Sequence, residues 1–162
     1  MDFHRNQLTT DTTIRNFLVG GNATLTVQNK DTGNRVTYRV KAKRNPAGRI
    51  NSVYSVGVLR GPDNIHSYKS LGYIPSRVAY GHYYNFRPNQ PQSLHAQGFM
   101  WLWNLVHGRN MGGVPRRDSV SIKDYPHVQV WHEGRCCRCG RKLTVPESIA
   151  TGIGPVCAEK PE

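Results

Sequence analysis

The sequence lacks any long apolar run. The longest one, around residues 99–106, is far shorter than the roughly 20 apolar residues that a membrane-spanning helix needs. The polar stretch at residues 1–13 also lacks the apolar core of a secretory signal peptide. These two absences predict a cytoplasmic protein without a membrane partner.

Acidic residues are scarce. The 162 residues include 22 Lys and Arg but only 10 Asp and Glu, which gives a formal net charge of +12. Seventeen of the basic and six of the acidic residues precede Trp131, so nearly all of the excess charge lies before the C-terminal segment. Such a charge attracts polyanions, above all nucleic acid. The alternative is that it only keeps the protein soluble.

Cysteine is absent from the first 135 residues, and all four cysteines fall within residues 136–157. A late cluster of this kind in a cytoplasmic chain indicates a metal site rather than disulfides. The alternatives are an iron–sulfur cluster or reduced thiols in a small core. The glycines and Pro155 around the thiols favour a metal-binding turn over the reduced core.

Alternating polar and apolar residues predict a meander of antiparallel strands in the first half of the chain. We expect strands at residues 23–29, 35–43, 53–59, 68–74 and around 128–130, a helix capped by Thr12 or Thr13, and a second helix between Ser93 and Gly108. The predicted fold class is α+β: an antiparallel sheet with a packed helix and a small C-terminal zinc knuckle. The predicted domains are a basic α+β domain at 1–126 and a zinc-binding module at 127–162.

Cys136 and Cys139 have the Cys-x-x-Cys spacing of a tight metal-binding turn, and Gly140 follows them directly. Cys157 then closes the site from a second arm. Thiolates in tetrahedral geometry favour Zn2+. For the fourth ligand we expect His132, with Cys137, His127 and His107 as alternatives.

A catalytic zinc keeps one position open and has a carboxylate base nearby. The His-x-Glu arm of the zinc deaminases is absent, because His132 and Glu133 are adjacent rather than separated by one residue. We therefore expect a structural zinc and a protein that is not an enzyme.

The segment at residues 136–157 reads Cys-x-x-Cys-Gly-Arg-x-Leu, then Pro-x-Ser, then Gly-Ile-Gly-Pro-x-Cys. It resembles a family of small zinc-binding modules of unknown function that occur in bacteriophage and prophage proteins. The Leu-Arg-Gly-Pro-Asp-Asn segment at residues 59–64 more loosely resembles the region before this module in phage accessory proteins. The resemblance implies zinc on Cys136, Cys139 and Cys157, and the cytoplasm of a host cell as location.

The strand predicted at residues 35–43 carries a row of cations. On a strand, alternate residues share one face, so Arg35, Arg39, Lys41 and Lys43 lie together with no acid between them. Arg44 and Arg49 follow shortly after. This row is the candidate nucleic-acid surface. The alternative is an ordinary solvated sheet face or a charge-protected edge strand.

The segment at residues 80–87 is rich in aromatic and basic residues and can either stack unpaired bases or pack against the second helix. Together these features predict a phage accessory protein that binds nucleic acid or a nucleic-acid complex. One rival is an inhibitor of a host nucleic-acid-binding protein complex, such as a CRISPR effector. The other is a zinc enzyme that acts on nucleotides.

Overall fold

The computed structural model describes residues 6–43, 45–47, 53–62, 66–75 and 84–159. In these residues seven strands form one antiparallel sheet in the order β1-β7-β2-β3-β4-β5-β6. The strands are β1 (Gln7–Leu8), β2 (Asn22–Asn29), β3 (Arg35–Lys41), β4 (Tyr54–Leu59), β5 (Tyr68–Ile74), β6 (Arg87–Pro88) and β7 (Val128–His132). The helices are α1 (Asp11–Leu18), α2 (Leu94–Val106), the 3-10 turn η2 (Ile122–Asp124), α3 (Pro146–Thr151) and α4 (Pro155–Ala158).

The predicted meander is confirmed as β2 to β5. The β2–β3 hairpin turns at Gly33, whose φ of 78° is the left-handed conformation that favours glycine. The Asn29 side chain supports the turn by accepting hydrogen bonds from the Asp31 and Thr32 amides. The α+β class is therefore as expected from alternation and turn chemistry.

One detail of the helices differs from the prediction. The N-cap of α1 is Thr10 rather than Thr12 or Thr13, because Thr10 exchanges hydrogen bonds with Thr13 in a capping box. The second helix is confirmed as α2, and its first residue, Leu94, is 83% exposed. The helix turns Phe99, Leu102 and Trp103 towards the sheet.

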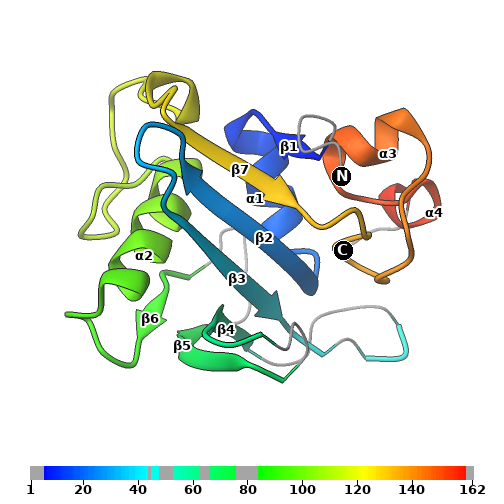
Figure 1. The fold of residues 1–162 in the computed structure, drawn as a ribbon, viewed down its shortest axis with the longest axis horizontal. Coiled ribbons are helices and arrows are strands. Elements are labelled where there is room, and N and C mark those ends of the chain that lie inside the picture. Colours follow the sequence, from blue (N-terminus) through cyan, green and yellow to red (C-terminus); the bar gives the residue numbers. More distant parts are fainter. Residues whose placement is uncertain (1–5, 44, 48–52, 63–65, 76–83, 160–162) are drawn as a thin grey trace.

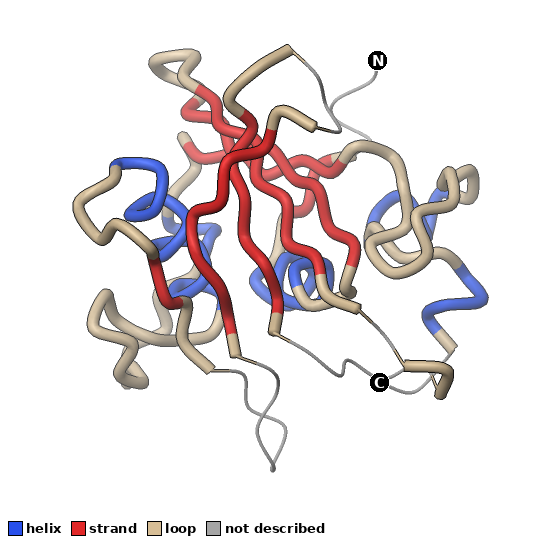
Figure 2. The backbone as a smooth tube through the Cα atoms, turned by 90° about the horizontal axis from the view of Figure 1, so that it is seen from below, coloured by secondary structure: helices blue, strands red, loops and turns tan. Residues whose placement is uncertain are grey.

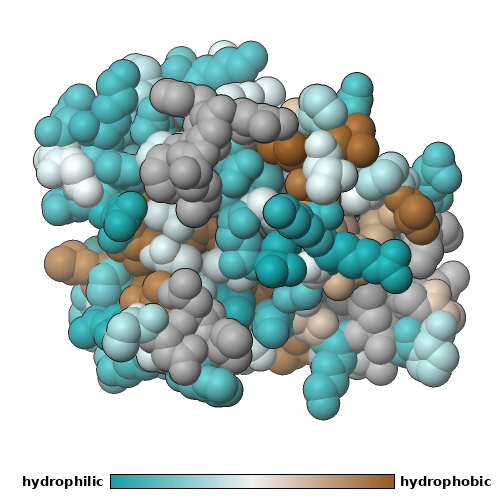
Figure 3. All heavy atoms as spheres, turned by 45° about the vertical axis from the view of Figure 1, so that its right-hand side comes forward, coloured by the Kyte–Doolittle hydropathy of each residue, from teal (hydrophilic) through white to brown (hydrophobic). Residues whose placement is uncertain are grey.

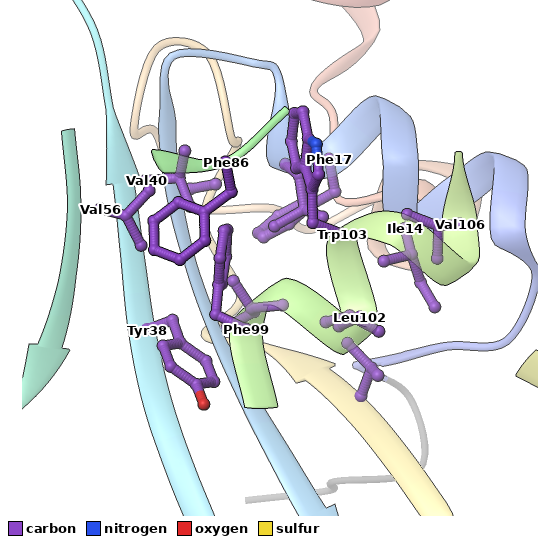
Figure 4. Packing of buried hydrophobic residues seen from close by; sticks show 14 of the residues in the cluster. Ile14, Phe17, Tyr38, Val40, Val56, Phe86, Phe99, Leu102, Trp103 and Val106 are labelled. Carbon is purple, nitrogen blue, oxygen red and sulfur yellow. The ribbon is translucent and has the colours of Figure 1, made fainter. Parts of the chain in front are cut away.

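The main core lies between one face of the sheet and the helices α1 and α2. Phe99 is at its centre, with its ring centroid 4.9 Å from that of Phe86 and 5.3 Å from that of Tyr38 (Figure 4). β7 and β2 pass in front of α1 in Figure 1, so the opposite face of these strands and of the neighbouring β3 points towards the viewer. We call this opposite face the open face.

The C-terminal cysteine segment is attached to the end of a central strand. β7 pairs with both β1 and β2, although it comes last in the chain. The predicted boundary after residue 126 falls just before β7, so Val128–His132 belong to the sheet and the small module begins after His132. In Figures 1 and 2 its helices α3 and α4 lie at the end of the molecule opposite α2.

None of the helices in the described residues has the length and apolar character needed to cross a membrane.

Candidate metal centre and open sheet face

A small hairpin after β7 carries the first two cysteines. The backbone of Gly134 and Leu143 pairs across it at 2.8 Å, and Cys136 donates its amide to the Arg141 carbonyl at 2.8 Å. Gly140 ends the turn with a φ of 79°, which relieves the strain of the Cys-x-x-Cys loop. The local sequence therefore brings Cys136 and Cys139 to the same side of one tight turn.

The second arm brings Cys157 to this turn. α3 begins at Pro146, directly after its N-cap Val145, and it ends at Gly152 with a φ of 75°. Pro155 then starts α4, which contains Cys157. The Gly154 amide, between the two helices, donates a hydrogen bond to Cys136 Sγ at 3.3 Å.

The sulfurs of Cys136, Cys139 and Cys157 all lie within 4.8 Å of one another. Cys136 and Cys157 are buried and Cys139 is exposed. The three thiols converge from two arms at a spacing that fits a single metal ion. Donors that are all sulfur suit soft and borderline metals rather than magnesium or calcium.

Backbone amides prepare this site for negative charge. Burial acts to raise the pKa of the Cys136 thiol, but amide donors from Gly154, Cys139 and Arg138 outweigh burial and lower the pKa to about 7. Burial and the neighbouring Cys139 and Cys136 raise the pKa of Cys157 to about 11. A bound cation would offset this mutual repulsion, because metal binding requires all three thiols to lose their protons.

His132 does not join the three cysteines as the expected fourth ligand. It is 3% exposed, and both ring nitrogens face backbone groups: Nε2 lies 2.6 Å from the Ile149 carbonyl, and Nδ1 accepts the Gly134 amide at 2.9 Å. Burial lowers its pKa, which keeps the ring neutral with its proton on Nε2. His132 thus fastens α3 to β7 and has no nitrogen left for a metal.

The other predicted candidates for a fourth ligand also lie elsewhere. Cys137 packs into the main core beside Gly20, on the opposite side of the turn from Cys136. The His107 ring lies against the tilted ring of Trp103, with the two ring centroids 4.0 Å apart, and His127 lies beside Tyr125. Among the described residues, only the three cysteines form a group with ligand atoms this close together.

The predicted basic residues of β3 share the open face. Arg35 and Lys41 are exposed and Arg39 is half-buried, while Tyr38 and Val40 between them are buried in the core. Lys43 lies just beyond the strand and is exposed, and Arg44 and Arg49 lie outside the described residues. The row of cations is therefore confirmed for the described part of the strand.

Aromatic side chains on neighbouring strands extend this face. The Arg39 guanidinium lies 4.0 Å from the centre of the Tyr68 ring in β5, and Thr24 in β2 lies on the same face. Trp131 in β7 pairs in register with Thr26, on the same face. A hollow of ≈ 510 Å³ lies on this face, lined by the two aromatic residues, by Arg35 and by the threonines Thr24, Thr26 and Thr37, and Glu133 also borders it.

The hollow's floor is made of small polar side chains. Thr26 and Thr37 lie opposite each other in register, and their hydroxyls hydrogen-bond at 2.8 Å. The two aromatic residues come from strands on either side of β2 and β3, so the hollow extends across this part of the sheet. We name it the sheet hollow.

Sequence reasoning missed Tyr68 and Trp131 because it sought aromatics in the segment at residues 80–87. Residues 80–83 lie outside the described residues, Tyr84 is exposed and Phe86 is part of the core. The alternation of β5 and β7 carried the missing signal, but it becomes meaningful only when the two strands are placed around β2–β3.

The C-terminal segment also stands out in comparison with known proteins. Residues 131–161 match DUF6011, a family of unknown function. No curated protein and no solved structure matches the chain significantly. The matched range covers both arms of the cysteine group and the end of β7, so the recognisable similarity lies in the candidate metal centre and not in the rest of the sheet.

Proposed function

We propose that this chain is a phage-type accessory protein that binds nucleic acid, or a nucleic-acid complex, through the open face of its sheet. Zn2+ on Cys136, Cys139 and Cys157 holds the C-terminal module in shape. The phage assignment is supported by the resemblance of residues 136–157 and, more loosely, by that of residues 59–64. The binding role is supported by the surface described above, and no catalytic role is proposed.

The zinc proposal is supported by the donor set. Three sulfurs from two arms, with amide donors aimed at one of them, are typical of structural zinc turns. The purified protein should contain about one equivalent of zinc per chain, measured by elemental analysis. A stoichiometric yield of an iron–sulfur chromophore instead would contradict this proposal.

Cobalt substitution reports on the fourth coordination position. A closed site gives a tetrahedral visible spectrum that does not respond to small anions. A spectrum that changes on adding thiocyanate or cyanide reveals an exchangeable ligand and favours the nucleotide-acting zinc enzyme instead.

One observation supports nucleic-acid binding most directly: Arg35, Arg39 and Lys41 lie along one strand, interrupted only by Thr37, on a sheet face that the core helices do not occupy. Lysine and arginine on such a row neutralise successive phosphates. The neighbouring Tyr68 and Trp131 are partly exposed aromatic residues, and the Arg39 guanidinium covers one face of the Tyr68 ring. Unpaired bases stack on aromatic residues of this kind, which favours a single strand over a duplex. Glu133 disfavours phosphate at its own edge of the sheet hollow.

The test measures binding of fluorescein-labelled single-stranded DNA and RNA by anisotropy across a salt series. Replacement of Arg35 and Arg39 by Gln should weaken binding and flatten the slope of log K against log salt by about 1.4, or roughly 0.7 per lost contact to a single strand. The matched control replaces Arg117 and Lys123, two exposed cations outside this face, and should leave the slope unchanged.

Equal losses in both variants would show that only net charge matters and would remove the surface assignment. A protein that binds no oligonucleotide but retains one host protein complex after nuclease treatment is instead an inhibitor of that complex.

A further inference from the structure

A second hollow lies where β3 ends and the cysteine module begins. It has a volume of ≈ 720 Å³ and receives side chains from both regions. Lys41 and Lys43 come from the end of β3, and Arg138 comes from the turn between Cys136 and Cys139. None of the described residues that line it is acidic. We call it the junction cleft.

Arg138 is held in the junction cleft by both arms of the metal centre. Its amide donates to Cys136 Sγ at 3.4 Å, and its Nη1 donates to the Cys157 carbonyl at 3.3 Å. The side chain is half-buried, unlike Arg135 and Arg141 on the same hairpin, which are exposed. The position of this guanidinium therefore depends on the two arms being closed around the cysteine group.

The sheet side of the junction cleft also contacts the turn between Cys136 and Cys139. Asn22, at the start of β2, donates its amide to the Cys137 carbonyl at 2.7 Å. Its side chain packs so tightly on Gly140 that a methyl group there would lie 2.9 Å from Asn22 Nδ2. Asn22 and Ser55 then add polar groups to the cleft lining. Arg138 therefore forms part of the junction cleft only when the module is docked on the sheet.

Two lysines, one arginine, an amide and a hydroxyl are the groups that bind phosphate oxygens in proteins. Arginine supplies directed donors, whereas lysine acts as a compact charge. We propose that the junction cleft binds a phosphate group and that the metal centre positions Arg138 for this contact. The metal would then control ligand binding as well as the shape of the module.

This inference rests on the proposed function in one respect: we assign the phosphate to a nucleic-acid strand that continues from the open face. Lys41 supports this continuity, because it belongs to the basic row of β3 and also lines the junction cleft. A free phosphate ion presents the same chemistry, so the experiment includes both ligands. Figure 3 shows the molecule with the side that bears the module turned forward, where hydrophilic residues lie beside smaller hydrophobic areas.

The experiment uses the full chain loaded with zinc, with metal content measured for every variant. A labelled single-stranded oligonucleotide is titrated by anisotropy, and inorganic phosphate is titrated at constant ionic strength by amide NMR. Arg138→Gln should weaken oligonucleotide binding about tenfold, since it removes a charged hydrogen-bonding partner. The matched control Arg141→Gln, on the same hairpin, should change it less than about twofold.

Metal removal supplies the second arm of the test. Chelation should lower the affinity of the unmodified protein to that of Arg138→Gln, and should lower the variant little further. Equal losses in both proteins would show that the metal acts independently of Arg138 and would overturn the inference. The inference would also be overturned if chelation left the affinity of the unmodified protein for the oligonucleotide unchanged.

The phosphate titration separates the two proposals. Shifts at the amides of Asn22, Lys41 and Ser55 support the junction cleft even if Arg138→Gln loses its metal, and their absence overturns it. Phosphate binding without oligonucleotide binding keeps the cleft and removes the nucleic-acid function. If the oligonucleotide binds equally well to the protein and to Arg138→Gln, the nucleic-acid function is kept and the junction cleft is overturned. If neither ligand binds, both proposals are overturned.

Discussion

The sheet and the cysteine module are stabilised in different ways. The main core joins large side chains from both core helices and from strands β1 to β5 and β7, including Phe17, Phe99 and Trp103. The module core has four buried residues, Cys136, Leu143, Ile149 and Cys157, and two of these are metal-ligand candidates. Units with so little apolar surface need a metal, a disulfide or a docking partner to fold. The module has two of these devices: its cysteine group and its contact with the sheet.

The contact between the regions is narrow but specific. Cys137 enters the main core beside Gly20, and Gly152 packs on Phe17. Ile153 contacts both cores. The comparison therefore predicts a stable sheet that survives loss of the metal, and a module that does not.

Metal removal should have the largest effect, because it should unfold the cysteine module and leave the sheet folded. Structural zinc contributes about 10–16 kcal/mol to the folding of zinc-finger peptides, so chelation, or Cys157→Ser, should unfold the module. Hydrogen exchange should then lose protection at residues 134–159 and keep it in β2 to β5. Simultaneous loss of protection in the sheet would show that the two regions fold as one unit.

Truncation of the main core should show the reverse pattern. Phe99→Ala should cost about 3–5 kcal/mol, because it empties a site between Tyr38, Phe86 and Trp103. Urea denaturation followed by intrinsic fluorescence measures this loss. Leu94→Ala on the same helix is the control and should stay within about 0.5 kcal/mol, because Leu94 is exposed.

A substitution at the contact itself should weaken docking. A Cβ on Gly20 would collide with Cys137 Sγ and lie 2.6 Å from the Cys137 carbonyl oxygen. Gly20→Ala should therefore cost about 1–3 kcal/mol through overpacking and should raise exchange at residues 134–159 first. Gly57→Ala, whose Cβ would lie 3.4 Å from its nearest neighbour, is the matched control. Equal exchange rates in the two variants would argue against docking through Gly20.

Acid should act on the sheet region through His107. Burial lowers the pKa of this ring to about 4, with Arg109 and Arg15 adding to the effect and the Trp103 carbonyl opposing it. The unfolded chain binds this proton near pH 6.5 and the folded chain only near pH 4, so stability falls as the pH drops between these values. The loss should approach about 2 kcal/mol at pH 5.

The measurement is the urea midpoint between pH 7 and pH 5 in the presence of saturating zinc. His107→Gln should reduce this pH dependence, because glutamine cannot take up the proton. The same slope in the variant would assign the acid sensitivity to another group.

The prediction from sequence succeeded where neighbouring residues determine the structure. Alternation in residues 22–41 and the glycine at position 33 predict the hairpin and place Arg35, Arg39 and Lys41 on one face. The spacing of Cys136 and Cys139 predicts their convergence, since the turn that carries them is only a few residues long. The prediction of His132 as the fourth ligand failed because proximity in the sequence does not reveal the direction of its side chain. The ring is buried, and its two nitrogens hydrogen-bond to the Ile149 carbonyl and the Gly134 amide.

The sequence by itself determined the basic strand, the meander and the sulfur group, because alternation, turn residues and ligand spacing act over a few residues of chain. Only the tertiary structure decided that β7 lies between β1 and β2 and that Trp131 therefore faces Thr26. It also decided that Arg138 meets Lys41 across the junction cleft. These pairs are about a hundred residues apart in the chain, and packing of the whole core, rather than any local preference, brings them together.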